Sequence, residues 1–255
     1  MAIIISSRNN NLFKKILSLK NKKNRDRESL FLIEGKKFVL EAQKCSMVKN
    51  IIVSETYFKN NKNDLFNLEE KIVFSDYIFE MISDTENTQG IVALCEKNKI
   101  DIDNIFKENN IIILNNINDP GNLGCIIRNC VAFDVGVIII SKGSVDLYNP
   151  KVLRASAGNI FKIKIFCEVN ITKILSKLKH AGFYIYATYL SSNNYIHTIK
   201  FKLKKVIIFG NESNGVSNDL IDFIDETIKI KTNSVESLNL AVSSGIILNQ
   251  IFNSR

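Results

Sequence analysis

The sequence predicts an α/β protein in which a parallel sheet forms the second part of the chain and a smaller α/β region precedes it. Three observations lead to this prediction. From residue 111 onward, strand patterns alternate with helix patterns, which is the order that builds parallel sheets. One of these strands, KKVIIFG, is apolar almost without interruption, as expected for a strand buried on both faces. A charged stretch without Pro or Gly, EKNKIDIDNIFKENN, separates the two parts.

The first part combines one amphipathic helix pattern with short apolar runs. Its helix pattern consists of Leu12, Phe13, Ile16, Leu17 and Leu19. Four later runs have the composition of strands: LFLIEG, NIIVS, KIVF and GIVALC. The charged stretch at residues 96–110 has few features of a core element, so we place the domain boundary within it. The expected domains are residues 1–100 and residues 106–255.

The second part repeats the order strand, helix, strand. Asn149 suits an N-cap and Pro150 suits the first position of a helix. The predicted strands are IIILN, VGVIIIS, IKIFC, FYIYATYL, KKVIIFG and ETIKI. The predicted helices are residues 121–133, NPKVLRAS, TKILSKLKH and a last helix from about Leu238 to Phe252.

The positive charge is concentrated at the beginning of the chain. Residues 1–50 contain 12 Lys and Arg against 4 Asp and Glu, a balance of +8 that equals the net charge of the whole chain. The segment KNKKNRDR therefore predicts a contact with a polyanion, and nucleic acid before a membrane surface, because no lipid anchor accompanies it. The alternative is a solvated, lysine-rich helix face. The candidate contacts in this segment are Lys22, Lys23, Arg25 and Arg27.

Cysteine and histidine usage indicates neither a disulfide framework nor a metal site. The five cysteines are odd in number and lack CxxC spacing, so we expect buried free thiols in a reducing compartment. The two histidines, His180 and His197, are too isolated to indicate a metal centre. No apolar run reaches membrane-spanning length, and we expect a soluble, cytoplasmic protein.

Ligands of parallel sheets bind at the carboxyl ends of strands, so the loops after the strands are the candidate sites. The first loop, NINDPGNLGCIIR, contains one of only two prolines in the chain. Its Gly121 and Gly124 allow a partner to approach closely at a helix start, where free N–H groups favour anions. Asn122 and Arg128 lie six residues apart, within range of a shared site at the beginning of this helix.

Two further loops follow predicted strands. FGNESNGVS holds Glu212 on a turn between Gly210 and Gly215, and NSVESLNLAVSSG opens the last helix with Ser237 and Asn239. Each loop also has an ordinary explanation. Asn122 and Ser237 could be N-caps, Glu212 a turn residue and Arg128 a side chain that reaches water beside an apolar run. Three such loops at carboxyl strand ends together favour a functional site.

The order of these motifs resembles a known family. DPGNLGCIIRNCVAF, LYNPKVLRASAGNIF, IIFGNESNGVS and ESLNLAVSSGIIL are similar to successive motifs of the SpoU (TrmH-like) branch of the SPOUT methyltransferases. FLIEGKKFVLEA and ISDTENTQGIVAL resemble the small substrate-binding domain that binds RNA in many members. The resemblance covers nearly the whole chain. It implies ribose 2′-O-methylation of RNA, rRNA before tRNA, with S-adenosylmethionine, by a homodimer whose C-terminal α/β domain contains a trefoil knot.

The resemblance also implies roles for individual residues. Arg128 is expected to hold an RNA phosphate or the developing 2′-alkoxide, and a role as the base is disfavoured because guanidinium hardly ever loses its proton. The backbone of Gly210, Ile230 and Leu238 is expected to contact the adenine end of the cofactor, and Arg154 is expected to contact RNA. The implied active-site polar set is Asn122, Arg128, Glu212, Ser237 and Asn239.

One segment departs from the family pattern. Members usually carry Ile-Pro-Met and a glycine before the Ser-Leu-Asn motif, whereas this chain reads IKIKTNSVESLN and is about one residue shorter. We expect a cofactor loop of different shape that still binds, because Ser237, Leu238 and Asn239 are present. Two rival functions are disfavoured by the sequence. The intact polar set argues against a non-catalytic RNA-binding or ribosome-assembly protein, and the absence of GxGxxG after a strand argues against a dinucleotide-dependent oxidoreductase.

Overall fold

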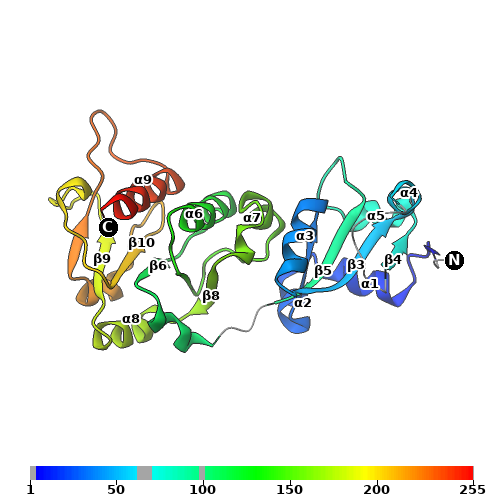
Figure 1. Ribbon diagram of the computed structural model, residues 1–255, viewed down its shortest axis with the longest axis horizontal. Helices are drawn as coiled ribbons and strands as arrows, with labels where there is room; N and C mark the ends of the chain where they lie inside the picture. Colours follow the sequence, from blue (N-terminus) through cyan, green and yellow to red (C-terminus); the bar gives the residue numbers. More distant parts are fainter. Residues whose placement is uncertain (1–3, 62–70, 98–100, 255) are drawn as a thin grey trace. The chain divides into compact units, whose positions relative to one another are not determined.

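The computed structural model describes residues 4–61, 71–97 and 101–254. Residues 98–100, which fall within the predicted domain boundary, lie outside the described residues. The chain forms two compact units (Figure 1). Unit 1 comprises residues 1–99 together with 148–153, and unit 2 comprises residues 100–147 together with 154–255.

Unit 1 is built on a mixed sheet with the strand order β1-β4-β3-β5-β2. Strand β3 runs parallel to β4 and antiparallel to β5, and β2 is antiparallel to β5. The four strands expected from the apolar runs are confirmed, and the short β1 was not expected. The strands are β1 (Ile4–Ile5), β2 (Leu30–Glu34), β3 (Val48–Ser54), β4 (Lys71–Phe74) and β5 (Ile91–Glu96).

The first helix of unit 1 follows from its sequence pattern. Asn10 caps it by accepting the N–H groups of Leu12 and Phe13, and its apolar stripe buries Phe13 and Ile16. Phe13 packs edge-on against Phe74 of β4, with ring centroids 5.8 Å apart. The helices of this unit are α1 (Asn11–Ser18), α2 (Lys22–Glu28), α3 (Lys36–Lys44), α4 (Glu55–Asn60) and α5 (Asp76–Ile82).

Unit 2 is built on a sheet in which every described strand pair is parallel, which confirms the predicted fold class. The strand order is β11-β9-β10-β6-β7-β8. The predicted strands are all present: β6 (Asn110–Leu114), β7 (Val137–Ser141), β8 (Lys164–Val169), β9 (Tyr184–Thr188), β10 (Lys205–Phe209) and β11 (Glu226–Ile228). The α-helices after residue 100 are α6 (Pro120–Ala132), α7 (Pro150–Ala155), α8 (Ile171–His180) and α9 (Leu240–Asn253), and residues 150–153 of α7 belong to unit 1. The 3₁₀ helices of unit 2 are η1 (Ile102–Lys107), η2 (Asn159–Phe161), η3 (Ile196–Thr198) and η4 (Asn218–Phe223).

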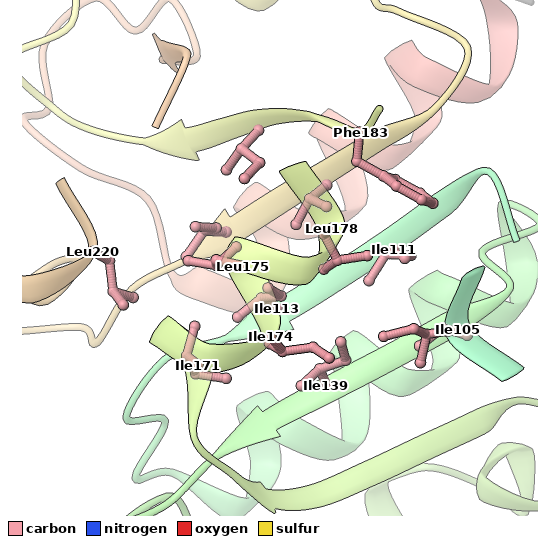
Figure 2. Packing of buried hydrophobic residues seen from close by; sticks show 14 of the residues in the cluster. Ile105, Ile111, Ile113, Ile139, Ile171, Ile174, Leu175, Leu178, Phe183 and Leu220 are labelled. Atoms are coloured by element: carbon pink, nitrogen blue, oxygen red, sulfur yellow. The ribbon is translucent and has the colours of Figure 1, made fainter. Parts of the chain in front are cut away.

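Both faces of this sheet are covered, which explains why its strands are apolar at consecutive positions. On one face, Ile174 and Leu178 of α8 point toward Ile111 and Ile113 of β6 (Figure 2). On the other face α6 packs against α9, and Ile112 lines a small cavity together with side chains of α9. The helices leave the carboxyl ends of the strands free to carry the functional loops.

Two expectations about local structure need correction. The charged stretch at residues 96–110 does contain a core element, because η1 buries Ile105 completely in the core of unit 2. Only Cys95 and Cys130 are buried free thiols, and burial raises the pKa of both. Cys45 and Cys167 are exposed.

Candidate functional site

Helix α6 presents Asn122 to the site from its first turn. The N-cap is Asp119, whose carboxylate accepts the Asn122 N–H at 2.7 Å, and Pro120 occupies the first helical position. The explanation of Asn122 as an N-cap is therefore wrong. Its side chain is only 9% exposed, and its Nδ2 donates to Glu212 Oε1 at 2.7 Å.

Helix α9 contributes Asn239, which is both an N-cap and a member of the site. Its Oδ1 accepts the N–H groups of Ala241 and Val242, so its Nδ2 must face away from the helix. That Nδ2 donates to Asn122 Oδ1 at 3.0 Å. The cap contacts therefore orient the Asn239 amide, and Asn239 in turn orients the Asn122 amide. Hydrogen bonds run from the start of α9 through Asn239 and Asn122 to the carboxylate of Glu212.

Glu212 lies on a tight turn directly after β10. The turn is closed by paired backbone hydrogen bonds between Asn211 and Gly215, both 2.9 Å. Gly210 is required by crowding, because a Cβ there would lie 2.2 Å from the carbonyl carbon of Gly215 and 2.3 Å from the nitrogen of Val216. Glu212 itself is exposed, and its Oε2 has no partner among the described residues. One carboxylate oxygen is therefore held and the other is open.

The structure brings together Asn122, Glu212 and Asn239, but it forms no such contacts for Arg128 and Ser237. Arg128 is exposed in the third turn of α6, and Ser237 is exposed in the loop before α9. Within the described part of the chain, neither side chain makes a hydrogen bond or an ion pair. Their roles in the polar set stay predictions.

The segment from Ile230 to Leu238 leaves its backbone donors open. No N–H group of these nine residues donates a hydrogen bond to another described residue, and the side chains of Ile230 and Leu238 are half-buried. Ligand pockets are commonly lined by such open main-chain groups together with aliphatic side chains. The contacts expected from Ile230 and Leu238 to the adenine end of the cofactor stay predictions.

The basic segment of unit 1 differs from its prediction at one position. Lys22, Lys23 and Arg27 on α2 are exposed, and Arg27 is paired with Glu28 at 3.0 Å. Arg25 is only 5% exposed. Its Nη1 donates to the carbonyls of Leu19 and Lys20, both at 2.8 Å, and so closes the C-terminal end of α1. The prediction that Arg25 contacts RNA is therefore wrong.

Several polar residues around the site were not predicted. Asn129 of α6 donates to Ala241 O and to Ser244 Oγ of α9, both at 2.9 Å, and so fixes the two helices to each other. Asn115 and Asn116, directly after β6, bind the end of β7 and the loop that follows β10. A pair of asparagines directly after an apolar strand was the available signal.

The described residues contain neither a candidate metal site nor a membrane-spanning helix. No group of three or more His, Cys, Asp or Glu side chains suited to a metal ion occurs in residues 4–61, 71–97 and 101–254. No helix in the same residues is long and apolar enough to cross a membrane.

The parallel sheet, the Glu212 carboxylate with one open oxygen and the loop with open N–H groups together are typical of an α/β protein with a ligand site at the carboxyl edge of its sheet. Comparison with known proteins narrows this class. A model described as the SpoU rRNA Methylase family matches residues 109–249, and one described as the MRM3-like substrate binding domain matches residues 10–93. The first match covers more than half of the chain, so the chain belongs to the SpoU rRNA methylase family. The expected class, an S-adenosylmethionine-dependent RNA 2′-O-methyltransferase, is confirmed.

Individual relatives extend over nearly the whole chain. RlmP of Bacillus subtilis (strain 168), a 23S rRNA (guanosine(2553)-2′-O)-methyltransferase, is 29% identical over 246 residues, which cover 96% of this chain and 97% of that protein. The AdoMet-bound rRNA methyltransferase from Sinorhizobium meliloti superimposes with a TM-score of 0.84 at 26% identity, over 98% of this chain and 97% of that chain. AviRb from Streptomyces viridochromogenes, at 21% identity and a TM-score of 0.85 over 96% of this chain and 97% of its own, shows the shared fold.

Proposed function

We propose that this protein transfers the methyl group of S-adenosylmethionine to a ribose 2′-hydroxyl of ribosomal RNA. The proposal depends on the hydrogen bonds from Asn239 to Asn122 and from Asn122 to Glu212, which leave one oxygen of the Glu212 carboxylate open. The preference for rRNA over tRNA follows the full-length similarity to RlmP, a 23S rRNA methyltransferase.

The residues of unit 2 supply alignment and charge stabilisation. S-adenosylmethionine carries an already activated methyl group, so the protein has mainly to align the hydroxyl and stabilise the charge that develops on its oxygen. Ile230 and Leu238, with the backbone of Gly210, hold the cofactor. Arg128, which is exposed and has no partner among the described residues, holds an RNA phosphate or the 2′-oxygen. Ser237 contributes its hydroxyl from the loop before α9.

Unit 1 contributes RNA affinity. Lys22, Lys23 and Arg27 lie exposed on α2, where they can neutralise phosphates. Arg154, exposed in the last turn of α7, joins them as an RNA contact. In this proposal residues 1–100 bind the substrate and residues 106–255 perform the chemistry, in the cytoplasm where ribosomal RNA is available.

We further propose a homodimer that forms through α9. Part of the small-residue segment of this helix is used within the chain, since Ser244 is buried and Gly245 lies against Asn129. The outer side of α9 still presents Val242 at 51% exposure and Ile246 at 39%, one turn apart. Apolar side chains at this spacing suit a partner helix. Light scattering at micromolar concentration should show a dimer, and a monomer that still methylates RNA would contradict this proposal.

The experiment for the function is methyl transfer from labelled S-adenosylmethionine to rRNA from cells that lack the gene. Label should enter the RNA, and mapping should place it on one ribose 2′-oxygen. The Asn122→Ala variant, folded and able to bind the cofactor, should transfer far less. Binding of rRNA without any transfer by the wild-type protein would instead support a non-catalytic RNA-binding protein. Label on a base would refute the 2′-O assignment.

A further inference from the structure

Asn116 lies at a junction of three loops at the carboxyl edge of the unit 2 sheet. It follows β6 in a left-handed conformation, with φ of 57°. Its N–H donates to Ser141 Oγ at the end of β7 at 2.8 Å, and its Oδ1 accepts from the same hydroxyl at 3.3 Å. Its carbonyl accepts from Asn211 Nδ2 at 2.8 Å, and its own Nδ2 donates to Ser217 Oγ at 3.1 Å. One residue therefore connects the loop after β6 to the end of β7 and to the loop after β10.

The neighbouring Asn115 strengthens the connection to the β10 loop. It is 4% exposed, and its Oδ1 accepts both the N–H and the Oγ–H of Ser217, each at 2.8 Å. Asn211 begins this loop and Ser217 ends it. The two asparagines after β6 thus hold the β10 loop at both of its ends. Glu212 lies between these two attachments.

The side-chain hydrogen bond of Asn116, and not its conformation, suggests a role beyond shaping the turn, because asparagine often adopts a positive φ. Glycine adopts a positive φ at lower cost, and it would keep the backbone hydrogen bonds to Ser141 and Asn211. What asparagine adds is the amide, which donates to Ser217 across the sheet edge and accepts from the nearby Ser141. The chain segment that contains Asn116 leads directly into α6 and Asn122. The amide therefore couples the position of Glu212 to that of Asn122.

We propose that Asn116 is a positioning residue for methyl transfer, which holds the β10 loop so that Glu212 meets Asn122 before RNA arrives. The inference rests on the proposed function of this site. Hydrogen bonds made in advance avoid reorganisation at the moment of reaction. Misplacement of reacting groups by a fraction of an ångström to an ångström is costly, so loss of the amide should reduce turnover more than substrate binding.

Asn116→Gly is the central variant, because it keeps the left-handed conformation and both backbone hydrogen bonds and removes only the amide. It should lower kcat by about tenfold, with the KM for RNA and the affinity for S-adenosylmethionine nearly unchanged. Ser217→Ala removes the partner, together with the hydroxyl that donates to Asn115, and should cause a loss at least as large. The double variant should lose little more than either single variant, because both remove the same coupling. Asn116→Asp should not rescue activity, since a carboxylate lacks the N–H donor.

A matched control lies at the opposite end of the same strand. Asn110 accepts from Lys205 Nζ at 2.7 Å at the amino edge of the sheet. Asn110→Ala should lower the melting temperature and leave kcat per folded molecule unchanged. Amide hydrogen exchange in the free protein gives a readout apart from activity. Exchange of the Ser217 and Gly215 amides should accelerate by about tenfold or more in Asn116→Gly and stay unchanged in Asn110→Ala.

The outcomes separate this inference from the function on which it rests. If Asn116→Gly and Ser217→Ala are less stable but turn over at the wild-type rate, the amide is only structural and the inference is wrong. If Asn116→Gly does not fold, Ser217→Ala decides by the same criteria. A wild-type protein that binds cofactor and RNA but transfers no methyl group would refute the proposed function, whereas the exchange rates would still show whether Asn116 holds the loop.

Discussion

Two glutamates near strand ends, Glu34 in unit 1 and Glu212 in unit 2, differ in how many hydrogen bonds their carboxylates accept. Glu34 ends β2, and both of its carboxylate oxygens accept hydrogen bonds from a single loop after α5. Glu212 follows β10, and only one of its oxygens is bound. The donors to Glu34 are Ser83 Oγ at 2.6 Å, Thr85 Oγ1 at 2.7 Å, Thr88 Oγ1 at 2.7 Å and the Asp84 N–H at 2.9 Å.

The Glu34 carboxylate therefore has a structural role, whereas the Glu212 carboxylate keeps one oxygen open for a ligand. Burial raises the pKa of Glu34, but the hydrogen bonds from Ser83, Thr88, the Asp84 backbone and Thr85 outweigh burial, so the pKa lies below its usual value. Glu34 is an ionised carboxylate whose function is to shape a loop. The arginines show the same contrast, because Arg25 is buried against two carbonyls and Arg128 is exposed without a partner among the described residues. We expect charged groups with open atoms, such as those of Glu212 and Arg128, to govern activity. We expect charged groups that are fully bound within the fold, such as those of Glu34 and Arg25, to govern stability.

The largest effect is expected at Arg128. Arg128→Ala should stay folded and bind S-adenosylmethionine, because the exposed side chain supports no other described residue. Its turnover should fall by about a hundredfold or more, the usual scale for loss of one preorganised donor. Arg128→Lys should not restore activity, because an ammonium cannot reproduce a planar two-pronged contact. Steady-state kinetics together with cofactor titration measure both expectations. A folded Arg128→Ala enzyme with normal turnover would mean that this arginine merely faces solvent.

Glu212→Gln should have the next largest effect. The side-chain oxygen of glutamine can still accept the Asn122 amide, so the loop should keep its position. The open oxygen is replaced by a donor, and the charge is lost. We expect kcat to fall by about tenfold or more and the melting temperature to change little. Unchanged turnover in this variant would show that Glu212, like Glu34, only holds a loop.

Glu34→Gln should affect stability and not turnover at saturating RNA. The amide nitrogen would face hydroxyl donors that lose their acceptor, which costs about 1–3 kcal/mol of unfolding free energy. A lowered pKa gives stability that is complete above the unfolded value of about 4.3 and is lost as the pH falls through the folded value. The stability difference between wild type and variant should therefore shrink between about pH 6 and about pH 3. Denaturant titrations across this range measure it, and a constant difference would contradict the assignment.

The fold was largely predictable because burial leaves a local pattern. Continuous apolar runs such as the one in β10 predicted a parallel sheet covered on both faces, and the sheet has this form. The same reasoning missed η1, in which the buried Ile105 and the half-buried Ile102 and Phe106 alternate with polar residues. So short an element leaves too weak a pattern to detect. The trefoil knot, implied only by the resemblance, stays a prediction.

The three hydrogen-bonded residues of the candidate site could be identified from the sequence, but their contacts could not. The motifs identified Asn122, Glu212 and Asn239, and the fold brings Glu212 and Asn239 to Asn122 although they lie 90 and 117 residues from it in the chain. The orientation of each amide depends on the cap of α9, which only the structure shows. Net charge likewise could not distinguish Arg25 from its neighbours, because the carbonyls that bind Arg25 are present in every peptide.

The smallest effect concerns the basic segment of α2, where the buried Arg25 lies beside the exposed Lys22, Lys23 and Arg27. Replacing Lys22, Lys23 and Arg27 with alanine should weaken RNA binding by reducing the number of phosphates neutralised. The slope of log affinity against log salt should fall by about 0.7 to 0.9 for each phosphate that is no longer neutralised. Fluorescence anisotropy with labelled rRNA fragments at several salt concentrations measures the slope. Cofactor affinity should not change, because the loops proposed to bind the cofactor belong to unit 2.

Arg25→Ala is the matched control for this measurement, since it removes one positive charge from the same helix. It leaves the carbonyls of Leu19 and Lys20 without their donor, so it should lower the unfolding free energy by about 1–3 kcal/mol. The salt slope of the folded variant should equal that of the wild type, because a buried guanidinium bound to carbonyls does not release a counterion when RNA binds. A slope reduced as much in Arg25→Ala as in the single variant Lys23→Ala would show that the α2 charges act only through overall charge. An unaltered slope in the triple variant would show that RNA binds elsewhere on the protein.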